Sequence, residues 1–300
     1  MLIACVQSDV SFAQPEANLA RVLAWMQKAA HGPPDSATHA AGPAAAEFVV
    51  FPECMLTGYT FDSREQAFEV ALEIDSPIFT SLVEAASDWN QLVTIGFLER
   101  SGEQLHNSAA LLGPDGMIGC YRKIHLPGLG VDRFVDRGEQ AYQSYPAETA
   151  RSGDARIGLA ICYDASFPEP IRVLGLSGAD VIALGTNWPK EGIHTSMIIP
   201  PARSMENHLY FVAANRVGRE NGFEFCGRSS ICGPDGVVLA RSDDDQETIL
   251  FAEADLAIAR NKTIQRTPGT HVIDRFADRR PEFYGEIIQP VDAPHAQQEK

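Results

Sequence analysis

The sequence predicts an α/β protein with mixed sheets and helices on the outside. Short apolar runs, of the length of buried strands, alternate along the chain with longer stretches that carry helix signals. The turn sequence Gly-Pro-Asp-Gly also occurs twice, at residues 113–116 and 233–236, each time between two apolar runs. Each occurrence predicts a hairpin. One hairpin in each half of the chain favours two facing sheets.

The first predicted elements are a strand and a helix. Leu2–Val6 has the pattern of the strand, and Pro15–Ala30 has that of the helix. Residues 31–46 are rich in turn formers. We expect them to form a surface loop rather than a domain linker, because the strand Phe48–Phe51 that follows needs partners from elsewhere in a sheet.

The rest of the chain continues this alternation as far as about Asp255. The predicted elements are, in order, helices near 64–72 and 77–89, strands Leu92–Leu98, Leu105–Leu112, Met117–Tyr121 and Ile157–Ile161, a helix from Pro168 to Leu176, the strand Val181–Leu184, a helix near 195–207, and the strands Tyr210–Ala214, Ser229–Cys232 and Val237–Ala240. No internal boundary stands out. We therefore expect one domain over residues 1–285 and a C-terminal tail over 286–300.

The composition narrows the class of partner. A formal charge of −16, a pI near 4.9 and the lack of a Lys/Arg cluster argue against nucleic acid or an anionic membrane and favour a neutral or cationic small molecule. No apolar segment approaches the ~18 residues of a membrane span and the start does not resemble a signal peptide, so we expect a cytoplasmic protein. The six cysteines and eight histidines show no metal-binding spacing, so we expect reduced thiols, no metal and no cofactor.

Cys162 is the first candidate catalytic residue. It follows the predicted strand Ile157–Ile161 and precedes a helix that begins at Pro168, which predicts a tight strand-to-helix turn. Such a turn exposes a side chain, directs free backbone N–H groups toward it and lowers the pKa of a thiol through the positive end of the helix dipole. A nucleophile needs all three features. The alternative interpretation is a small cysteine of the core.

Two charged residues follow other predicted strands. Glu53 comes after the strand Phe48–Phe51, and Lys123 comes after the strand Met117–Tyr121. Active sites in α/β folds gather at strand ends, and a carboxylate in an apolar cleft has a raised pKa and can act as a general base. An ammonium group can stabilise both a thiolate and an oxyanion. Taken singly, each residue is more simply interpreted as a cap or a solvated charge.

Several segments taken together resemble the carbon–nitrogen hydrolase (nitrilase-like amidase) family. They are Phe-Pro-Glu-Cys-Met-Leu-Thr-Gly-Tyr at 51–59, Tyr-Arg-Lys-Ile-His-Leu at 121–126, Ile-Cys-Tyr-Asp-Ala-Ser-Phe-Pro-Glu at 161–169, Asn-Trp-Pro at 187–189, Ala-Arg-Ser-Met-Glu-Asn at 202–207 and Arg-Arg-Pro-Glu-Phe-Tyr-Gly at 279–285. The resemblance covers nearly the whole chain in order. Three separate motifs in register are a strong signal, whereas any one alone would be weak.

The resemblance implies a catalytic triad, with Glu53 as general base, Lys123 as oxyanion stabiliser and Cys162 as nucleophile. It also implies a four-layer α-β-β-α sandwich that forms a homodimer or a higher homo-oligomer. Many members have a second acid shortly after the lysine, and Asp132 is our choice among several acids in that segment. The expected reaction is acyl transfer to water through a thioester on Cys162, with the oxyanion held by Lys123 and the backbone N–H of Tyr163.

The residues after Cys162 narrow the substrate. Tyr163-Asp164 resembles the amidase and carbamoylase branches, whereas true nitrilases have Trp-Glu at this point. Ala165 and Ser166 stand where branches that act on carboxylate substrates often have Arg. We therefore expect a neutral or cationic amide or N-carbamoyl substrate. The candidate pocket walls, for each of which core packing is the alternative, are Tyr59, Phe167, Asn187 and Trp188.

Other interpretations stay open at this point. A Cys–His hydrolase with His125 or His106 as base is the nearest rival, although a partly buried, hydrogen-bonded histidine is the simpler interpretation of His125. A nitrilase or an N-acyltransferase of the same fold would use the same nucleophile. A catalytically idle binding protein would have the same fold but would not hydrolyse a substrate.

Overall fold

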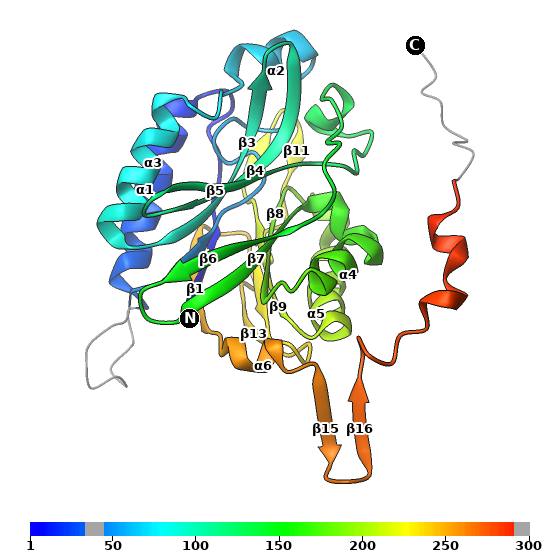
Figure 1. Ribbon diagram of the computed structural model, residues 1–300. Coiled ribbons are helices and arrows are strands. Elements are labelled where there is room, and N and C mark those ends of the chain that lie inside the picture. The colour runs from blue at the N-terminus through cyan, green and yellow to red at the C-terminus, as the bar shows by residue number, and fades with distance from the viewer. Residues whose placement is uncertain (34–44, 291–300) are drawn as a thin grey trace. The chain divides into compact units, whose positions relative to one another are not determined.

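Two mixed six-stranded sheets form the larger unit of the chain (Figure 1). The computed structural model describes residues 1–33 and 45–290, and the chain forms two compact units, Met1–Asn261 and one that begins at Lys262. In spatial order, the first sheet contains β14 (Thr248–Glu253), β1 (Leu2–Gln7), β2 (Phe48–Val50), β3 (Leu92–Ser101), β4 (Gln104–Gly113) and β5 (Gly116–Arg122). The second contains β13 (Val238–Arg241), β12 (Ser230–Cys232), β9 (Tyr210–Asn215), β8 (Val181–Thr186), β7 (Gly153–Ile161) and β6 (Ser144–Thr149).

Each sheet has a parallel centre and antiparallel edges. Strands β1, β2 and β3 pair in parallel, as do β7, β8 and β9, whereas the remaining pairs are antiparallel. Both Gly-Pro-Asp-Gly turns form hairpins, β4–β5 in the first sheet and β12–β13 in the second, as predicted. Parallel neighbours need crossover connections, and helices provide them.

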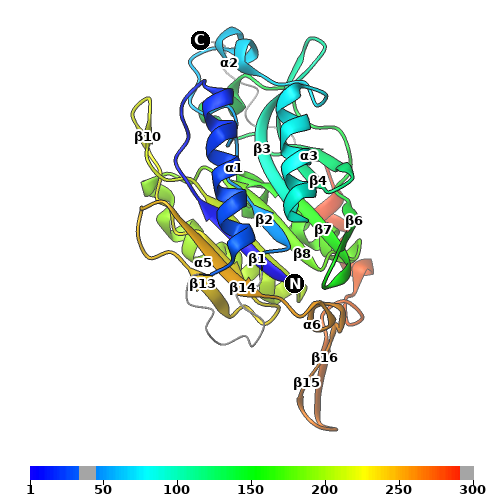
Figure 2. The same cartoon turned by 90° about the vertical axis from the view of Figure 1, so that its left-hand side faces the viewer.

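Four helices cover the outer faces of the two sheets, which makes four layers (Figures 1 and 2). Helices α1 (Pro15–His31) and α3 (Pro77–Trp89) pack on the first sheet, and α4 (Pro168–Leu176) and α5 (Ile193–Asn207) pack on the second. Side-chain alternation on β1 explains the layering. Ile3 and Cys5 belong to the core between the sheets, whereas Leu2, Ala4 and Val6 belong to the core beneath α1 and α3. The four-layer sandwich expected from the family resemblance is confirmed.

Smaller elements complete the described residues. The larger unit also contains α2 (Arg64–Val70), the short hairpin β10 (Arg219–Glu220) and β11 (Phe223–Glu224), and α6 (Leu256–Arg260). The second unit contains the antiparallel hairpin β15 (Thr263–Thr267) and β16 (His271–Asp274), followed by two short turns of 3₁₀ helix. Most of the loop expected at 31–46 and of the tail expected at 286–300 lies outside the described residues. The single domain expected over 1–285 stays a prediction.

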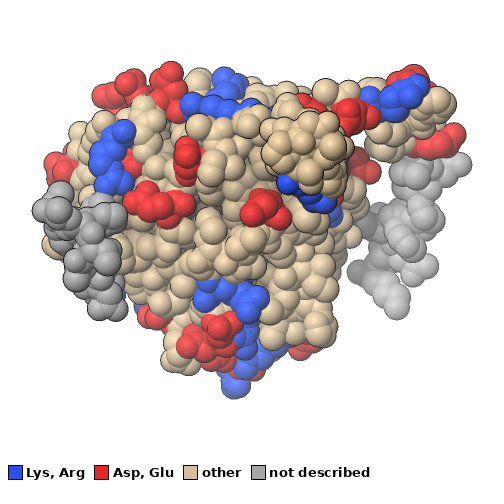
Figure 3. Space-filling view, turned by 90° about the horizontal axis from the view of Figure 1, so that it is seen from below, with Lys and Arg blue, Asp and Glu red and all other residues tan. Residues whose placement is uncertain are grey.

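The surface carries charges of both signs. Acidic and basic side chains are interspersed on the face drawn in Figure 3. Over residues 1–33 and 45–290, no helix is long and apolar enough to cross a membrane.

Candidate active site

Glu53 lies in a backbone passage between the two sheets. It follows β2, and its side chain is buried. A Cβ atom on Gly96 of β3 would lie 2.5 Å from the backbone nitrogen of Cys54, and one on Gly185 of β8 would lie 2.8 Å from that of Glu53. The segment can therefore pass between the sheets because each sheet has a residue without a side chain at the point of closest approach.

Lys123 brings two acids together in one buried cluster. It directly follows β5, and its Nζ donates to Glu53 Oε1 at 2.7 Å and to Asp132 Oδ2 at 2.6 Å. Asn107 closes a ring, because its Nδ2 donates to Glu53 Oε1 at 2.7 Å and to Asp132 Oδ1 at 2.9 Å. All four side chains are buried. Two carboxyl groups therefore share one ammonium and one amide, and Glu53 Oε2 has no hydrogen-bond partner.

Burial and charge together set the protonation of this cluster. Burial raises the pKa of Glu53 and the nearby Asp132 adds to the rise, although Lys123 and the hydrogen bond from Asn107 oppose it. Burial alone would lower the pKa of Lys123, but the two carboxylates outweigh it and raise the pKa well above the usual value. The ammonium is thus kept charged, and Glu53 holds a proton more readily than a solvent-exposed glutamate does.

Cys162 lies on the predicted turn between β7 and α4. The helix begins and ends at the predicted residues, Pro168 and Leu176, and Cys162 opens a short 3₁₀ turn with a φ of 42°. Positive φ is uncommon for a residue with a side chain and costs about 1–3 kcal/mol, so the surrounding contacts must hold this conformation. The charges of Glu53 and Lys123 act on the thiol, which places Cys162 in the same electrostatic cluster.

The lowered thiol pKa expected from the helix dipole is wrong. Burial raises the pKa of the Cys162 thiol well above its usual value, the negative charge of Glu53 raises it further, and Lys123 and the backbone N–H of Asn187 oppose the rise without reversing it. The helix begins only at Pro168, too far along the chain for its dipole to dominate. Cys162 therefore rests as a thiol, and its reaction requires a base.

The expected pocket residues lie in different surroundings. Tyr59 is buried, and its hydroxyl donates to Asp132 Oδ2 at 2.9 Å, which connects it to the cluster. Asn187 and Trp188 are buried after β8, and Asn187 Nδ2 donates to the backbone oxygen of Glu53 at 3.2 Å. Phe167 is partly buried. Their roles as pocket walls stay predictions, as do the catalytic roles assigned above and the backbone N–H role of Tyr163.

The aromatic residues after the nucleophile pack on one another. Phe167 stacks on His125 at 4.2 Å between ring centroids and meets Tyr163 edge-on at 5.1 Å. The exposed fraction of Tyr163 is 38%, so its ring reaches solvent. The imidazole of His125 makes a hydrogen bond of 2.9 Å with Asp164 Oδ1, which fits the simpler interpretation of that histidine.

Two polar residues of this region were not predicted from the sequence. Asn107 lies on β4, where it is buried in a strand that continues as an apolar run. A polar residue in such a strand was the signal that could have indicated a buried hydrogen-bonded site. Asp164 is buried, and both of its oxygens accept hydrogen bonds. A buried polar residue in an apolar segment needs partners, so each of these positions indicates a network.

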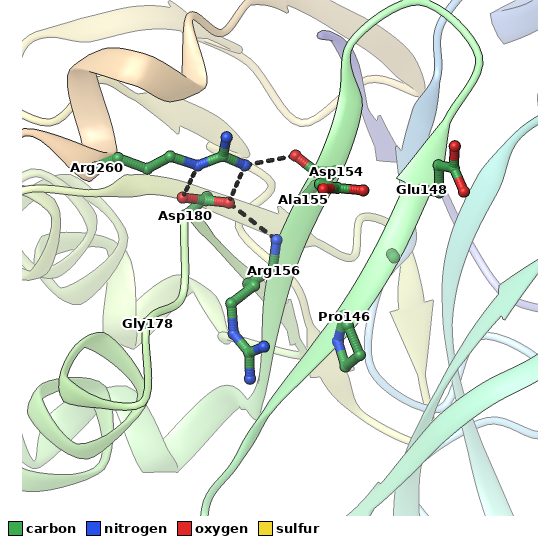
Figure 4. A pocket seen from close by; sticks show the side chains of 9 residues that line it. Pro146, Glu148, Asp154, Ala155, Arg156, Gly178, Asp180 and Arg260 are labelled. Carbon is green, nitrogen blue, oxygen red and sulfur yellow. Dashed lines mark hydrogen bonds and ion pairs between the residues drawn. The ribbon is translucent and has the colours of Figure 1, made fainter.

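A separate surface hollow lies at the opposite end of β7 and β8 (Figure 4). Its volume is about 700 Å³. Asp180 lies in its wall and accepts two hydrogen bonds from Arg260, at 3.0 and 2.9 Å, and one from the backbone of Arg156 at 2.9 Å. Both carboxylate oxygens of Asp180 are therefore paired. In the part of the chain that the structure describes, no group of three His, Cys, Asp or Glu side chains is arranged to hold a metal ion.

Comparisons with known proteins identify the family. The family model for carbon-nitrogen hydrolases matches residues 2–262. A nitrilase of Pyrococcus abyssi is 35% identical over 283 residues, which cover 94% of this chain and 98% of the relative. The N-carbamoylputrescine amidase of Arabidopsis thaliana is 29% identical over 262 residues, 80% of this chain and 84% of the relative.

A solved structure shares the fold. The crystal structure of an amidase from Nesterenkonia sp. superposes with a TM-score of 0.73 at 22% identity, and the match covers 96% of each chain. The family model and the Pyrococcus relative both extend over most of the chain, and the range matched by the family model includes the turn with Cys162 and the strand ends with Glu53 and Lys123. The chain therefore belongs to the carbon-nitrogen hydrolase family and is an enzyme of that class.

Proposed function

We propose that this enzyme hydrolyses the carbon–nitrogen bond of a small neutral or cationic amide or N-carbamoyl compound through a thioester on Cys162. The observation that carries the proposal is the free Oε2 of Glu53, which is buried without a hydrogen-bond partner on a carboxyl group of raised pKa. Lys123 and Asn107 hold the other oxygen. The free oxygen is therefore available to accept the proton of Cys162.

In the proposed first step, Glu53 accepts the thiol proton as the sulfur of Cys162 attacks the carbonyl carbon. A C–S bond forms, and the π electrons of the carbonyl become an oxyanion held by the ammonium of Lys123 and the backbone N–H of Tyr163. One such donor is worth about 3 kcal/mol, roughly a hundredfold in rate. The tetrahedral intermediate then collapses, the C–N bond breaks, and Glu53 returns its proton to the leaving ammonia or amine.

Water completes the cycle. Glu53 takes a proton from a water molecule as its oxygen adds to the thioester carbon, and collapse of the second tetrahedral intermediate releases the acid and the thiolate of Cys162. The thiolate recovers the proton from Glu53, which restores the resting enzyme. We assign Asp132 as the second acid, which keeps Lys123 charged through both steps, because its carboxylate lies 2.6 Å from the ammonium.

Two features support a substrate without a carboxylate. Ala165 and Ser166 follow the nucleophile segment, so no arginine is present at these two positions to pair with an acid group. The name of the Arabidopsis relative also gives its substrate as N-carbamoylputrescine, which carries a cationic amine. In a variant of the Nesterenkonia amidase, the acetamide moiety of fluoroacetamide is covalently attached to the active-site cysteine, which supports a nucleophilic role for the cysteine at this point of the fold.

The test compares wild type with Cys162→Ala and Cys162→Ser on primary amides, N-carbamoyl amines and nitriles, each in paired forms with and without a carboxylate. We expect wild type to release ammonia from an amide or N-carbamoyl compound that lacks the carboxylate, and both variants to be inactive while remaining folded. Mass spectrometry of quenched wild-type enzyme should find an acyl group on the Cys162 peptide. Wild-type turnover by Cys162→Ala would overturn the proposal.

A nitrilase activity is the second candidate, because a relative with that name is 35% identical. Faster turnover of the nitrile than of the matched amide would favour it. The homodimer and the cytoplasmic location also stay predictions, and light scattering of the purified protein tests the first of them.

A further inference from the structure

The buried carboxylate of Asp164 accepts hydrogen bonds from three separate parts of the chain. Its Oδ2 accepts from the backbone N–H of Ile161 at 2.9 Å and from the hydroxyl of Tyr121 at 2.8 Å. Its Oδ1 accepts from the hydroxyl of Tyr142 at 2.8 Å and lies 2.9 Å from Nδ1 and 3.3 Å from the backbone nitrogen of His125. Both oxygens are saturated, and the side chain is fully buried.

Apart from Tyr142, which lies just before β6, these partners belong to the two segments that carry the reacting groups. Tyr121 and His125 are each two residues from Lys123, the first near the end of β5 of the first sheet and the second on the segment that continues it. Asp164 and Ile161 enclose Cys162, at the end of β7 of the second sheet. The carboxylate therefore joins the lysine segment of one sheet to the cysteine turn of the other.

The hydrogen bond to Ile161 also closes the strained turn. Cys162 has a φ of 42°, and the backbone N–H that precedes it donates to the side chain that follows it by two residues. A strained conformation persists only where its surroundings fix it. Asp164 fixes the turn from inside through its hydrogen bond with Ile161, and its bonds with Tyr121 and Tyr142 hold it from outside the turn.

We propose that Asp164 is a positioning residue that holds the cysteine turn against the lysine segment and so fixes the thiol of Cys162 relative to the ammonium of Lys123. This inference rests on the proposed function, because it assigns Asp164 an effect on the same nucleophile and oxyanion stabiliser. Asp164 neither takes the proton of the thiol nor contacts the substrate. An error of about 1 Å in such an arrangement costs roughly a hundredfold in rate.

The network reaches the aromatic residues near the nucleophile through His125. Its ring stacks on Phe167, which in turn packs against Tyr163. Removal of the carboxylate would release every donor that Asp164 holds, whereas removal of the hydroxyl of Tyr142 would release one donor to Oδ1 together with the bonds of that hydroxyl to Tyr121 and His125. A graded series of variants is therefore possible.

The experiment measures kcat, KM, thermal unfolding and the rate of alkylation of Cys162 by iodoacetamide, followed on its peptide by mass spectrometry. The variants are Asp164→Asn, Tyr121→Phe, Tyr142→Phe and the double variant Tyr121→Phe/Asp164→Asn. The matched control is Tyr145→Phe, which loses a hydroxyl that bonds the backbone oxygen of Cys120 at 3.0 Å and does not contact Asp164.

We expect Asp164→Asn to lower kcat about a hundredfold with KM within about threefold of wild type, and to slow the alkylation of Cys162. Tyr121→Phe and Tyr142→Phe should each lower kcat about fivefold, by the loss of one hydrogen bond to the carboxylate. The double variant should be no slower than Asp164→Asn, because the hydroxyl of Tyr121 acts through the same carboxylate. The control should stay within about twofold of wild type.

A merely structural role predicts another pattern, in which the variants unfold at lower temperature while kcat of the folded enzyme and the alkylation rate stay at wild-type values. That result, or additive losses in the double variant, would overturn the inference. If Asp164→Asn does not fold, Tyr142→Phe decides, because Tyr142 is only partly buried and phenylalanine keeps the ring that packs against the core. An active Cys162→Ala would instead overturn the proposed function itself, so the two failures are distinguishable.

Discussion

Two glutamates at the two ends of β2 have opposite environments. Glu47 precedes the strand and Glu53 follows it, and both side chains are buried. Glu47 Oε1 accepts from the backbone N–H groups of Arg151 and Ser152 at 3.2 and 3.0 Å, and Oε2 accepts from the Leu2 backbone, the Arg151 guanidinium and the Ser152 hydroxyl at 3.1, 3.0 and 2.8 Å. Glu53 Oε2 has no partner at all.

The pKa values of the two groups move in opposite directions for this reason. Burial on its own would raise the pKa of Glu47, but hydrogen bonds from Ser152, Arg151 and Leu2 outweigh it and lower the pKa to about 2. For Glu53, burial prevails over its donors and raises the pKa. The many donors that face Glu47, against the deeper burial of Glu53 and its acidic neighbour Asp132, thus separate a structural carboxylate from one that can exchange a proton.

Exchanging each acid for its amide is the strongest test of this difference. Glu53→Gln should lower kcat by about a thousandfold or more, because no general base remains, and it should not lower the free energy of unfolding at pH 7. Glu47→Gln should leave kcat unchanged and reduce the free energy of unfolding. Ammonia release and urea unfolding of both variants measure the two effects. Comparable loss of activity in the two variants would contradict the distinction.

The pH dependence of Glu53→Gln has a definite sign. A raised folded-state pKa means that the folded protein holds a proton that the unfolded chain releases, so the free energy of unfolding falls as pH rises above about 4.5 toward the raised value. Glutamine removes this dependence. The free energy of unfolding of Glu53→Gln relative to wild type should therefore increase across that window.

Lys123→Met tests the cation that lies between the two acids. Loss of the ammonium removes the oxyanion stabiliser and leaves Glu53 and Asp132 facing each other, so kcat should fall about a few hundredfold. Because Lys123 opposes the rise in the pKa of Glu53, Glu53 should then hold its proton more tightly, and the pH at which the residual activity rises should move upward. A pH–rate profile of Lys123→Met measures this shift. An unshifted profile would mean that the two acids do not share the ammonium.

The sequence predicted that the three candidate catalytic residues follow buried strands. It did not predict the burial and the hydrogen bonds that set the pKa values of their side chains. Glu53, Lys123 and Cys162 were found because each follows an apolar run, and such a run predicts both a buried strand and its end. The lowered pKa of Cys162 was wrong because the dipole of a nearby helix can be inferred from residue order, whereas the burial that outweighs it depends on packing from both sheets.

Elements whose pattern depends on distant partners were also missed. Strand β6 contains Pro146 and several polar residues, and such a strand is stable only at the edge of a sheet, which the order of residues does not reveal. Strand β14 pairs with β1, from the other end of the same unit. Asn107 lies between two other polar residues, His106 and Ser108, and its role becomes visible only when the fold brings Glu53 and Asp132 to either side of its amide.

Asn107→Ala tests how far one amide fixes the base. The change removes a donor from both Glu53 and Asp132 and leaves the ammonium of Lys123 in place. We expect kcat to fall about thirtyfold, because the free oxygen of Glu53 is no longer held in one orientation. Ser108→Ala is the matched control, since the neighbouring hydroxyl donates to Glu99. Equal effects of the two substitutions on kcat would remove the special role of Asn107.

Acid titration of Glu47 gives the smallest of these effects and completes the comparison. A lowered folded-state pKa contributes stability that is fully present above the unfolded pKa of about 4.5 and is lost as pH falls toward 2. With partial screening by solvent, the contribution is about 1.5 kcal/mol. The free energy of unfolding of wild type should therefore exceed that of Glu47→Gln at pH 7, and the difference should shrink between pH 4.5 and 3. Glu148→Gln, at an exposed position of β6, should show no such convergence. If the difference in the free energy of unfolding between wild type and Glu47→Gln stays constant over this range, the negative charge of Glu47 does not contribute to the stability of the strand.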